Sequence, residues 1–141
     1  MAARRLKTAK LSDNRITELS QTTFNGQGRL QHVDLSRNLL VTLPEQLFQR
    51  TSLETFSASG NSLSEIPIKA LNPVQSTLRH LDLSHNEITT ISDSQLNQIQ
   101  LLVSLDLSGN AISTIDREAF CCVPDLQRLD LSGNPLQARR K

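Results

Sequence analysis

The chain has 141 residues with 15 basic and 14 acidic side chains, which gives a formal net charge of +1. A balance this close to neutrality creates no bulk field for nucleic acid or an anionic membrane, and we expect neither as a partner. No apolar run approaches the ~20 residues of a membrane span, so we expect no membrane insertion. The start, Met-Ala-Ala-Arg-Arg-Leu-Lys, carries positive charge without a following apolar segment, and we do not expect a signal peptide there.

Asparagine recurs along the chain at near-constant spacing, and each copy closes the same short pattern. The pattern reads L-x-x-L-x-L-x-x-N-x-L and starts near residues 6, 30, 53, 78, 102 and 126. The asparagines are Asn14, Asn38, Asn61, Asn86, Asn110 and Asn134. Self-similarity at a fixed period of this length indicates a repeat array. We therefore expect residues 1–141 to form a single array of six repeats.

Each repeat predicts a short strand followed by an irregular or short-helical outer segment. In the fourth repeat, Leu81 and Leu83 share parity and should point inward, whereas His80, Asp82 and Ser84 should point outward. Outer apolar columns follow five and ten residues after the asparagines, at Leu19, Leu43, Ile66, Ile91 and Ile115 and at Phe24, Phe48, Leu71, Leu96 and Phe120. One repeat cannot bury its own leucines, so neighbouring repeats must stack. The expected fold class is α/β, a solenoid with a parallel sheet on its concave side.

The unit resembles the typical leucine-rich repeat of animal extracellular proteins, which runs L-x-x-L-x-L-x-x-N-x-L-x-x-L-P-x-x-x-F-x-x-L-x-x. Proline follows the aliphatic position at Pro44 and Pro67, and Phe24, Phe48 and Phe120 occupy the phenylalanine column. The resemblance covers essentially the whole chain. It implies a horseshoe-shaped array like those of chaoptin-type adhesion proteins and Toll-like receptors, which bind protein partners through stacked repeats.

The asparagines are interpreted as structural residues. A buried side-chain amide offers both donors and an acceptor, which can satisfy the backbone where the chain leaves the strand. The ends, by contrast, show no cysteine-rich caps of the kind that usually close such arrays. Leu129, Leu131 and Leu136 would have no following repeat to cover them, so we expect a fragment of a longer protein. The uncapped repeats also allow homophilic or end-to-end association.

The expected geometry of the strands excludes a catalytic triad and a metal site among the histidines. His80, Asp82 and Ser84 are the three residue types of a catalytic triad, but a working triad needs the histidine between the other two. His32 lies two strands from His80, about 10 Å away at sheet spacing, which is too far to share a metal ion. Because no phosphate-binding loop or cofactor motif occurs either, we predict a protein without catalytic residues, metal or cofactor.

Two adjacent cysteines, Cys121 and Cys122, are predicted on the outer side beside Phe120. Neighbouring Cα atoms are ~3.8 Å apart, below the usual range for a disulfide, so we expect two reduced thiols rather than a vicinal bridge. Reduced thiols favour a reducing compartment, or partner cysteines elsewhere in a longer protein.

Partner binding is predicted on the concave sheet, where outward-facing residues stack across repeats. One column there carries aspartate in four of the six repeats, and this acidic ladder is either a binding feature or simply a common form of the repeat. The chain has no Trp or Tyr, so Arg37, Arg79 and Arg128 are the plausible anchors. The candidate binding residues are Asp34, Arg37, Arg79, His80, Asp82, His85, Asp106, Arg128 and Asp130.

The sequence alone is compatible with two functions. The first is a non-catalytic module from the ectodomain of a cell-surface or secreted leucine-rich-repeat receptor or adhesion protein, which binds a protein ligand or co-receptor. The second is a complete small leucine-rich-repeat adaptor in the cytoplasm. The period, the phenylalanine column and the missing caps favour the first, whereas the unpaired cysteines and the absent signal peptide favour the second.

Overall fold

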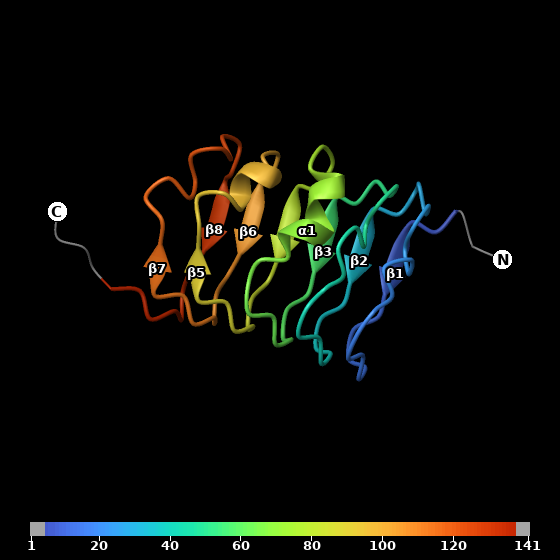
Figure 1. Ribbon diagram of the computed structural model, residues 1–141, viewed down its shortest axis with the longest axis horizontal. Coiled ribbons are helices and arrows are strands. Elements are labelled where there is room, and N and C mark those ends of the chain that lie inside the picture. The colour runs from blue at the N-terminus through green and yellow to red at the C-terminus, as the bar shows by residue number, and fades with distance from the viewer. Residues whose placement is uncertain (1–4, 138–141) are drawn as a thin grey trace.

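Six short parallel strands form one sheet that runs the length of the molecule (Figure 1). The computed structural model describes residues 5–137, and each strand of this sheet pairs with the strand of the next repeat. The strands are β1 (Thr8–Lys10), β2 (His32–Asp34), β3 (Thr55–Ser57), β4 (His80–Asp82), β6 (Ser104–Asp106) and β8 (Arg128–Asp130). Each falls within one predicted repeat, and the predicted α/β solenoid with a parallel sheet is confirmed.

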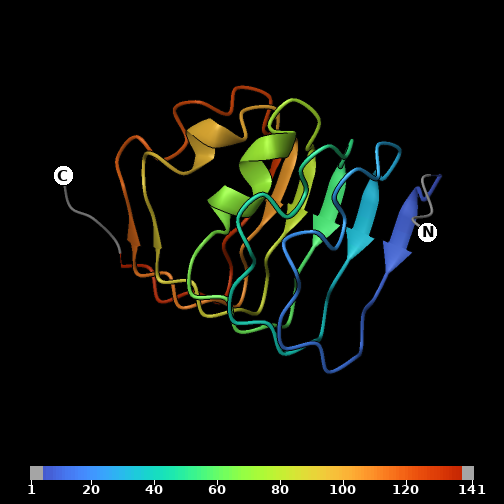
Figure 2. The ribbon, with the colours of Figure 1, turned by 45° about the vertical axis from the view of Figure 1, so that its right-hand side comes forward.

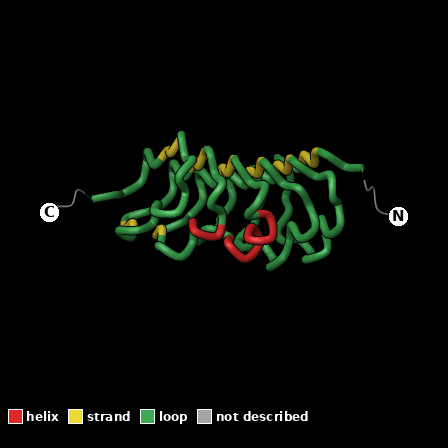
Figure 3. The backbone as a smooth tube through the Cα atoms, turned by 90° about the horizontal axis from the view of Figure 1, so that it is seen from above, coloured by secondary structure: helices red, strands yellow, loops and turns green. Residues whose placement is uncertain are grey.

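The opposite, outer side is mostly irregular, with a few short helical segments (Figure 3). These are the α-helix α1 (Ile68–Leu71) and the 3-10 helices η1 (Asn72–Val74) and η2 (Leu96–Gln98). Two further strands, β5 (Thr90–Ile91) and β7 (Thr114–Ile115), pair in parallel on this side (Figure 2). This second sheet was not predicted, and its β-branched Thr and Ile residues suit an extended backbone.

The core lies between the sheet and the outer segments. The middle residue of each strand faces inward, and Val33, Phe56 and Leu81 are buried there. Phe48 links the strand side to the outer side, because its ring stacks on Phe24 with centroids 5.6 Å apart and meets Phe56 edge-on at 4.9 Å. Aromatic pairs at these separations add to the stabilisation from burial alone.

Ser84 departs from the prediction that it points outward. It is buried, with 5% of its surface exposed, because β4 ends at Asp82 and the alternation of the strand ends with it. The Ser84 hydroxyl turns back and donates to Asp82 Oδ1 at 2.7 Å.

An asparagine ladder connects the repeats where the strands end. Asn86 shows its geometry: Nδ2 donates to Leu83 O in its own repeat at 3.1 Å and to Ala58 O in the preceding repeat at 3.0 Å. Its Oδ1 accepts the backbone N–H of Leu63, again in the preceding repeat, at 2.9 Å. The same bonds are made by Asn38, Asn61, Asn110 and Asn134. Each of these amides therefore satisfies backbone groups of two repeats at once.

Asn14 occupies the same position in the first repeat but makes fewer bonds. It is exposed, and within residues 5–137 its Nδ2 donates only to Leu11 O and Ser12 O of its own repeat. At the other end of the sheet, Leu129 and Leu136 are 41% and 40% exposed, and Leu131 is half-buried. Across residues 5–137, no helix has the length and apolar character needed to cross a bilayer.

Candidate functional site

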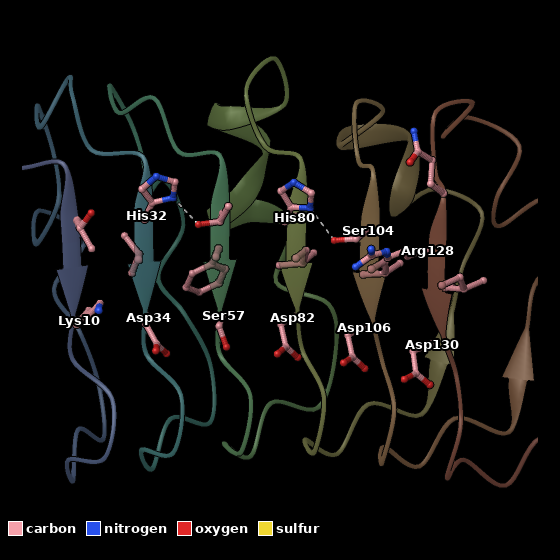
Figure 4. A pocket seen from close by; sticks show the side chains of 18 residues that line it. Lys10, His32, Asp34, Ser57, His80, Asp82, Ser104, Asp106, Arg128 and Asp130 are labelled. Atoms are coloured by element: carbon pink, nitrogen blue, oxygen red, sulfur yellow. Dashed lines mark hydrogen bonds between the residues drawn. The ribbon is translucent and has the colours of Figure 1, made fainter.

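The inner face of the six-stranded sheet forms a hollow of about 840 Å³ to which every strand contributes (Figure 4). The first and third residues of each strand present their side chains there, while the middle residue packs into the core. The first residues are Thr8, His32, Thr55, His80, Ser104 and Arg128, and the third residues are Lys10, Asp34, Ser57, Asp82, Asp106 and Asp130. The hollow is therefore lined by two parallel rows of polar side chains that cross the strands.

Carboxylates dominate the lower row in Figure 4, and we call Asp34, Asp82, Asp106 and Asp130 the aspartate row. Each one accepts two hydrogen bonds through Oδ1, from the backbone N–H and the hydroxyl of the serine two residues later. For Asp106 these bonds come from Ser108, at 2.9 and 2.7 Å. The four aspartates thus hold the turn that follows each strand, and they use one carboxylate oxygen to do so.

The end of the aspartate row shows the electrostatic effect of this turn. Side-chain and backbone hydrogen bonds from Ser132 lower the pKa of Asp130, because they stabilise its ionised form. In the third repeat Ser57 takes the aspartate position, and its hydroxyl accepts the Ser59 N–H at 3.3 Å. The turn therefore tolerates a neutral acceptor, so the negative charge of the other four positions is not required by its geometry.

The upper row contains two hydrogen-bonded pairs that link neighbouring strands (Figure 4). His32 Nδ1 lies 2.7 Å from Thr55 Oγ1, and His80 Nδ1 lies 2.8 Å from Ser104 Oγ. The possible triad of His80, Asp82 and Ser84 is not formed. In the described structure Asp82 bonds to Ser84 and not to His80, whereas a nucleophilic serine needs the histidine between itself and the carboxylate. Within residues 5–137, no group of three His, Cys, Asp or Glu side chains is arranged to hold a metal ion.

Six of the nine predicted binding residues line the hollow, and three do not. Asp34, His80, Asp82, Asp106, Arg128 and Asp130 lie in it. Arg79 is exposed but precedes β4 and is outside the lining. Arg37 and His85 also lie outside it, because they belong to the turn beyond the strands rather than to the strands themselves.

The backbone of that turn is left-handed at the residue before each asparagine. Arg37 has φ 55° and His85 has φ 56°, and Asp13 occupies the same position with φ 61°. The other three repeats have glycine there, at Gly60, Gly109 and Gly133. Glycine in half of the copies was the available sequence signal for this conformation, since glycine adopts positive φ without steric cost.

Arg37 is engaged in an ion pair instead of facing the hollow. Its Nε and Nη2 donate to Asp13 Oδ1 and Oδ2 at 2.6 and 2.9 Å, and each side chain is 61% exposed. The hydrogen bond from Arg37 lowers the pKa of the Asp13 carboxyl. This solvent-exposed ion pair connects the turns of the first two repeats.

A parallel sheet coiled into a solenoid, with a ladder of asparagines at the strand ends, defines a repeat protein. The sequence model of the leucine rich repeat matches residues 4–63 and 76–136. The chain therefore belongs to the leucine-rich-repeat proteins.

Two similar proteins place the chain within the family. Tsukushi of Mus musculus is 37% identical over 79 residues, which cover 55% of this chain and 22% of Tsukushi. Toll, in its complex with Spatzle from Drosophila, superposes with a TM-score of 0.85 at 29% identity over 92% of this chain and 17% of the Toll chain. These relatives are secreted or cell-surface proteins, so the extracellular prediction is supported at the level of the family.

A further solved structure shows the same fold at lower identity. In the complex of TLR13 with the RNA ssRNA13, the receptor superposes with a TM-score of 0.72 at 23% identity, over 96% of this chain and 23% of that chain. The chain spans less than a quarter of the length of each of these three proteins.

Proposed function

We propose that this chain is a protein-binding module from the ectodomain of a cell-surface or secreted leucine-rich-repeat protein. In this proposal, a protein ligand or co-receptor contacts the hollow face of the six-stranded sheet. The family assignment and the likeness to Toll, whose structure contains the protein Spatzle, support a binding role. The chain's own residues support the choice of surface.

The observation that carries the proposal is a hollow that presents a different polar side chain from strand to strand. The leucine and asparagine positions recur from repeat to repeat, because each repeat must pack on the next. The first residue of the strands, in contrast, changes from Thr to His, Thr, His, Ser and Arg along the sheet. These side chains face the hollow, so the hollow offers a partner a different set of polar groups at each strand.

The hollow carries charges of both signs, which favour the selection of one partner over a general attraction of charged molecules. The aspartate row has Lys10 at one end, and Arg128 stands in the upper row near its other end (Figure 4). Asp82 and Asp106 are only half-buried, and in the described structure each engages one carboxylate oxygen in hydrogen bonds. The second oxygen is left for a partner. Complementary charges on a partner would fix its register along the sheet.

A pair of matched substitutions tests the surface. Ser104→Arg places a long side chain in the hollow, whereas Ser113→Arg places the same side chain beside β7 on the outer side. The labelled chain would be applied to an array of extracellular proteins, and the affinity of each binding protein measured by surface plasmon resonance. We expect Ser104→Arg to weaken binding by about tenfold or more and Ser113→Arg to leave it unchanged.

The reverse pattern, loss with Ser113→Arg and none with Ser104→Arg, would place the interface on the outer side and reject the proposal. Circular dichroism of both variants checks that the array is intact. Asp106→Asn then isolates the charge, because the amide keeps an acceptor oxygen for Ser108. We expect it to change affinity with little change in the unfolding midpoint, and unaltered affinity would remove the Asp106 charge from the interface.

A further inference from the structure

The two adjacent cysteines lie close together on the outer side of the fifth repeat. Their sulfur atoms are 2.8 Å apart, in a turn in which the Cys121 N–H donates to Glu118 O at 3.1 Å. Cys121 is exposed and Cys122 is half-buried, so a small molecule reaches Cys121 first. They are the only two cysteines in the 141 residues, so within this sequence each can pair only with the other.

We propose that Cys121 and Cys122 are a reversible redox pair, which a low-molecular-weight disulfide oxidises to a vicinal bridge. The contact between the sulfurs supports this, because the bridge needs no movement of a distant segment. Adjacent Cα atoms are ~3.8 Å apart, closer than in ordinary disulfides, so the bridge is strained. Strained and exposed bridges are the easily reduced ones, and the pair can return to the dithiol.

The reaction proceeds by two thiol–disulfide exchanges. The Cys121 thiolate attacks one sulfur of the small disulfide, forming a mixed disulfide and releasing the first thiol. The Cys122 thiolate then attacks Cys121 Sγ, closes the bridge and displaces the second thiol. The two cysteines lose two electrons and two protons in total, and the small disulfide gains them as it becomes two thiols.

The surroundings of the pair control its rate. The hydrogen bond with Cys122 raises the pKa of the Cys121 thiol, and desolvation and the charges of Cys122, Glu118 and Asp93 raise it further. Because the thiolate is the nucleophile, the reaction should accelerate as the pH rises through the alkaline range. An extracellular location, which rests on the function proposed above, would favour the closed bridge. The geometry of the pair is independent of that function.

Intact-mass spectrometry with glutathione disulfide as the probe tests the proposal on the whole chain. We expect the native protein to lose two hydrogens and to retain no glutathione, and a reductant such as dithiothreitol should reverse the change. In Cys122→Ser the second exchange cannot occur, so Cys121 should keep one glutathione. Cys122 lies outside the lining of the hollow, so this result is separate from any result on partner binding.

Two outcomes would overturn the proposal. If the native chain accumulates glutathione adducts to the same extent as Cys122→Ser, the second thiol does not displace the first. If it forms disulfide-linked dimers on non-reducing gels, the thiols react between molecules. Repeating the reaction in urea measures what the fold contributes, and we expect a larger share of glutathione adduct in the unfolded chain, where the two sulfurs are no longer held together.

Discussion

The asparagine ladder and the aspartate row lie four residues apart in the same repeats, yet they act over different distances. Asn86 is buried and bonds to Leu83 in its own repeat and to Ala58 and Leu63 in the preceding one. Within residues 5–137 the carboxylate of Asp82 bonds only to Ser84, two residues along the chain. The first contact couples repeats and the second shapes a single turn. Coupling between repeats and the shape of the turn are thus assigned to different residues of one short segment.

Asn86→Ala is the substitution that tests this difference most strongly. It leaves the Leu63 N–H without its acceptor and takes away one of the two amide donors that the Ala58 and Leu83 carbonyls each have, and a buried group that loses its partner is costly. We expect a loss of about 3 kcal/mol of unfolding free energy, or about 10 °C in the midpoint for a chain of this size. Asp82→Ala serves as the matched control and should cost far less. Equal losses in thermal unfolding would show that the ladder does not couple the repeats as described.

Asn14→Ala sharpens the comparison within the ladder itself. Asn14 is exposed, and in the described part of the chain its side chain bonds only to Leu11 and Ser12, so its removal breaks no bond between the described repeats. We expect a cost of about 1 kcal/mol or less, as for a single solvent-accessible hydrogen bond. Urea unfolding of Asn14→Ala beside Asn86→Ala measures both. A loss as large as that of Asn86→Ala would mean that the asparagine acts through its own turn, not through the neighbouring repeat.

The ion pair of Asp13 and Arg37 also joins two repeats, but at the exposed surface, and it should give the smallest effect. The folded-state pKa of Asp13 is lowered by Arg37, so the ionised carboxylate stabilises the fold at any pH above its unfolded pKa of about 4. That contribution is lost as the pH falls through the lower folded pKa. The difference between the native chain and Asp13→Asn should therefore be present at neutral pH and disappear in acid. Exposed pairs contribute little, so a small difference is expected.

Urea midpoints at a series of pH values measure this difference. Arg37→Gln is the control background, because the pH-dependent effect of Asp13→Asn should shrink once the guanidinium, the main cause of the lowered Asp13 pKa, is gone. A difference that stays constant from neutral to acid pH would show that Asp13 acts through something other than its charge.

The periodicity of the sequence was sufficient to predict the sheet, down to its register. The alignment on asparagines places Thr8, His32, Thr55 and His80 in one column, and these residues are register partners in β1 to β4. The steps between repeats vary by a residue or two, but the strands stay in phase because the outer segments absorb the variation. The inward leucines fix each strand's position against its neighbour.

The candidate site was predictable only in part. The strands are three residues long, so the alternation that places His80 and Asp82 in the hollow ends before His85. A strand pattern alone does not reveal where the backbone turns left-handed, and this is why it did not predict that Arg37 lies outside the lining of the hollow. Its pairing with Asp13 depends on the three-dimensional position of two turns that lie 24 residues apart in the chain. Contacts of this kind are not encoded in the spacing of apolar residues.

The outer strands β5 and β7 have a consequence for the mechanics of the array. Paired strands lie ~4.8 Å apart, and the same pitch holds between β4 and β6 on the inner side. Where neighbouring repeats are equally spaced on the inner and the outer side, the array runs straight. A helical segment such as α1 is ~10 Å wide and increases the spacing between repeats on the outer side. A rigid ligand seated on β4 and β6 would therefore meet the stretch of the array in which both the inner and the outer side are tied by backbone hydrogen bonds.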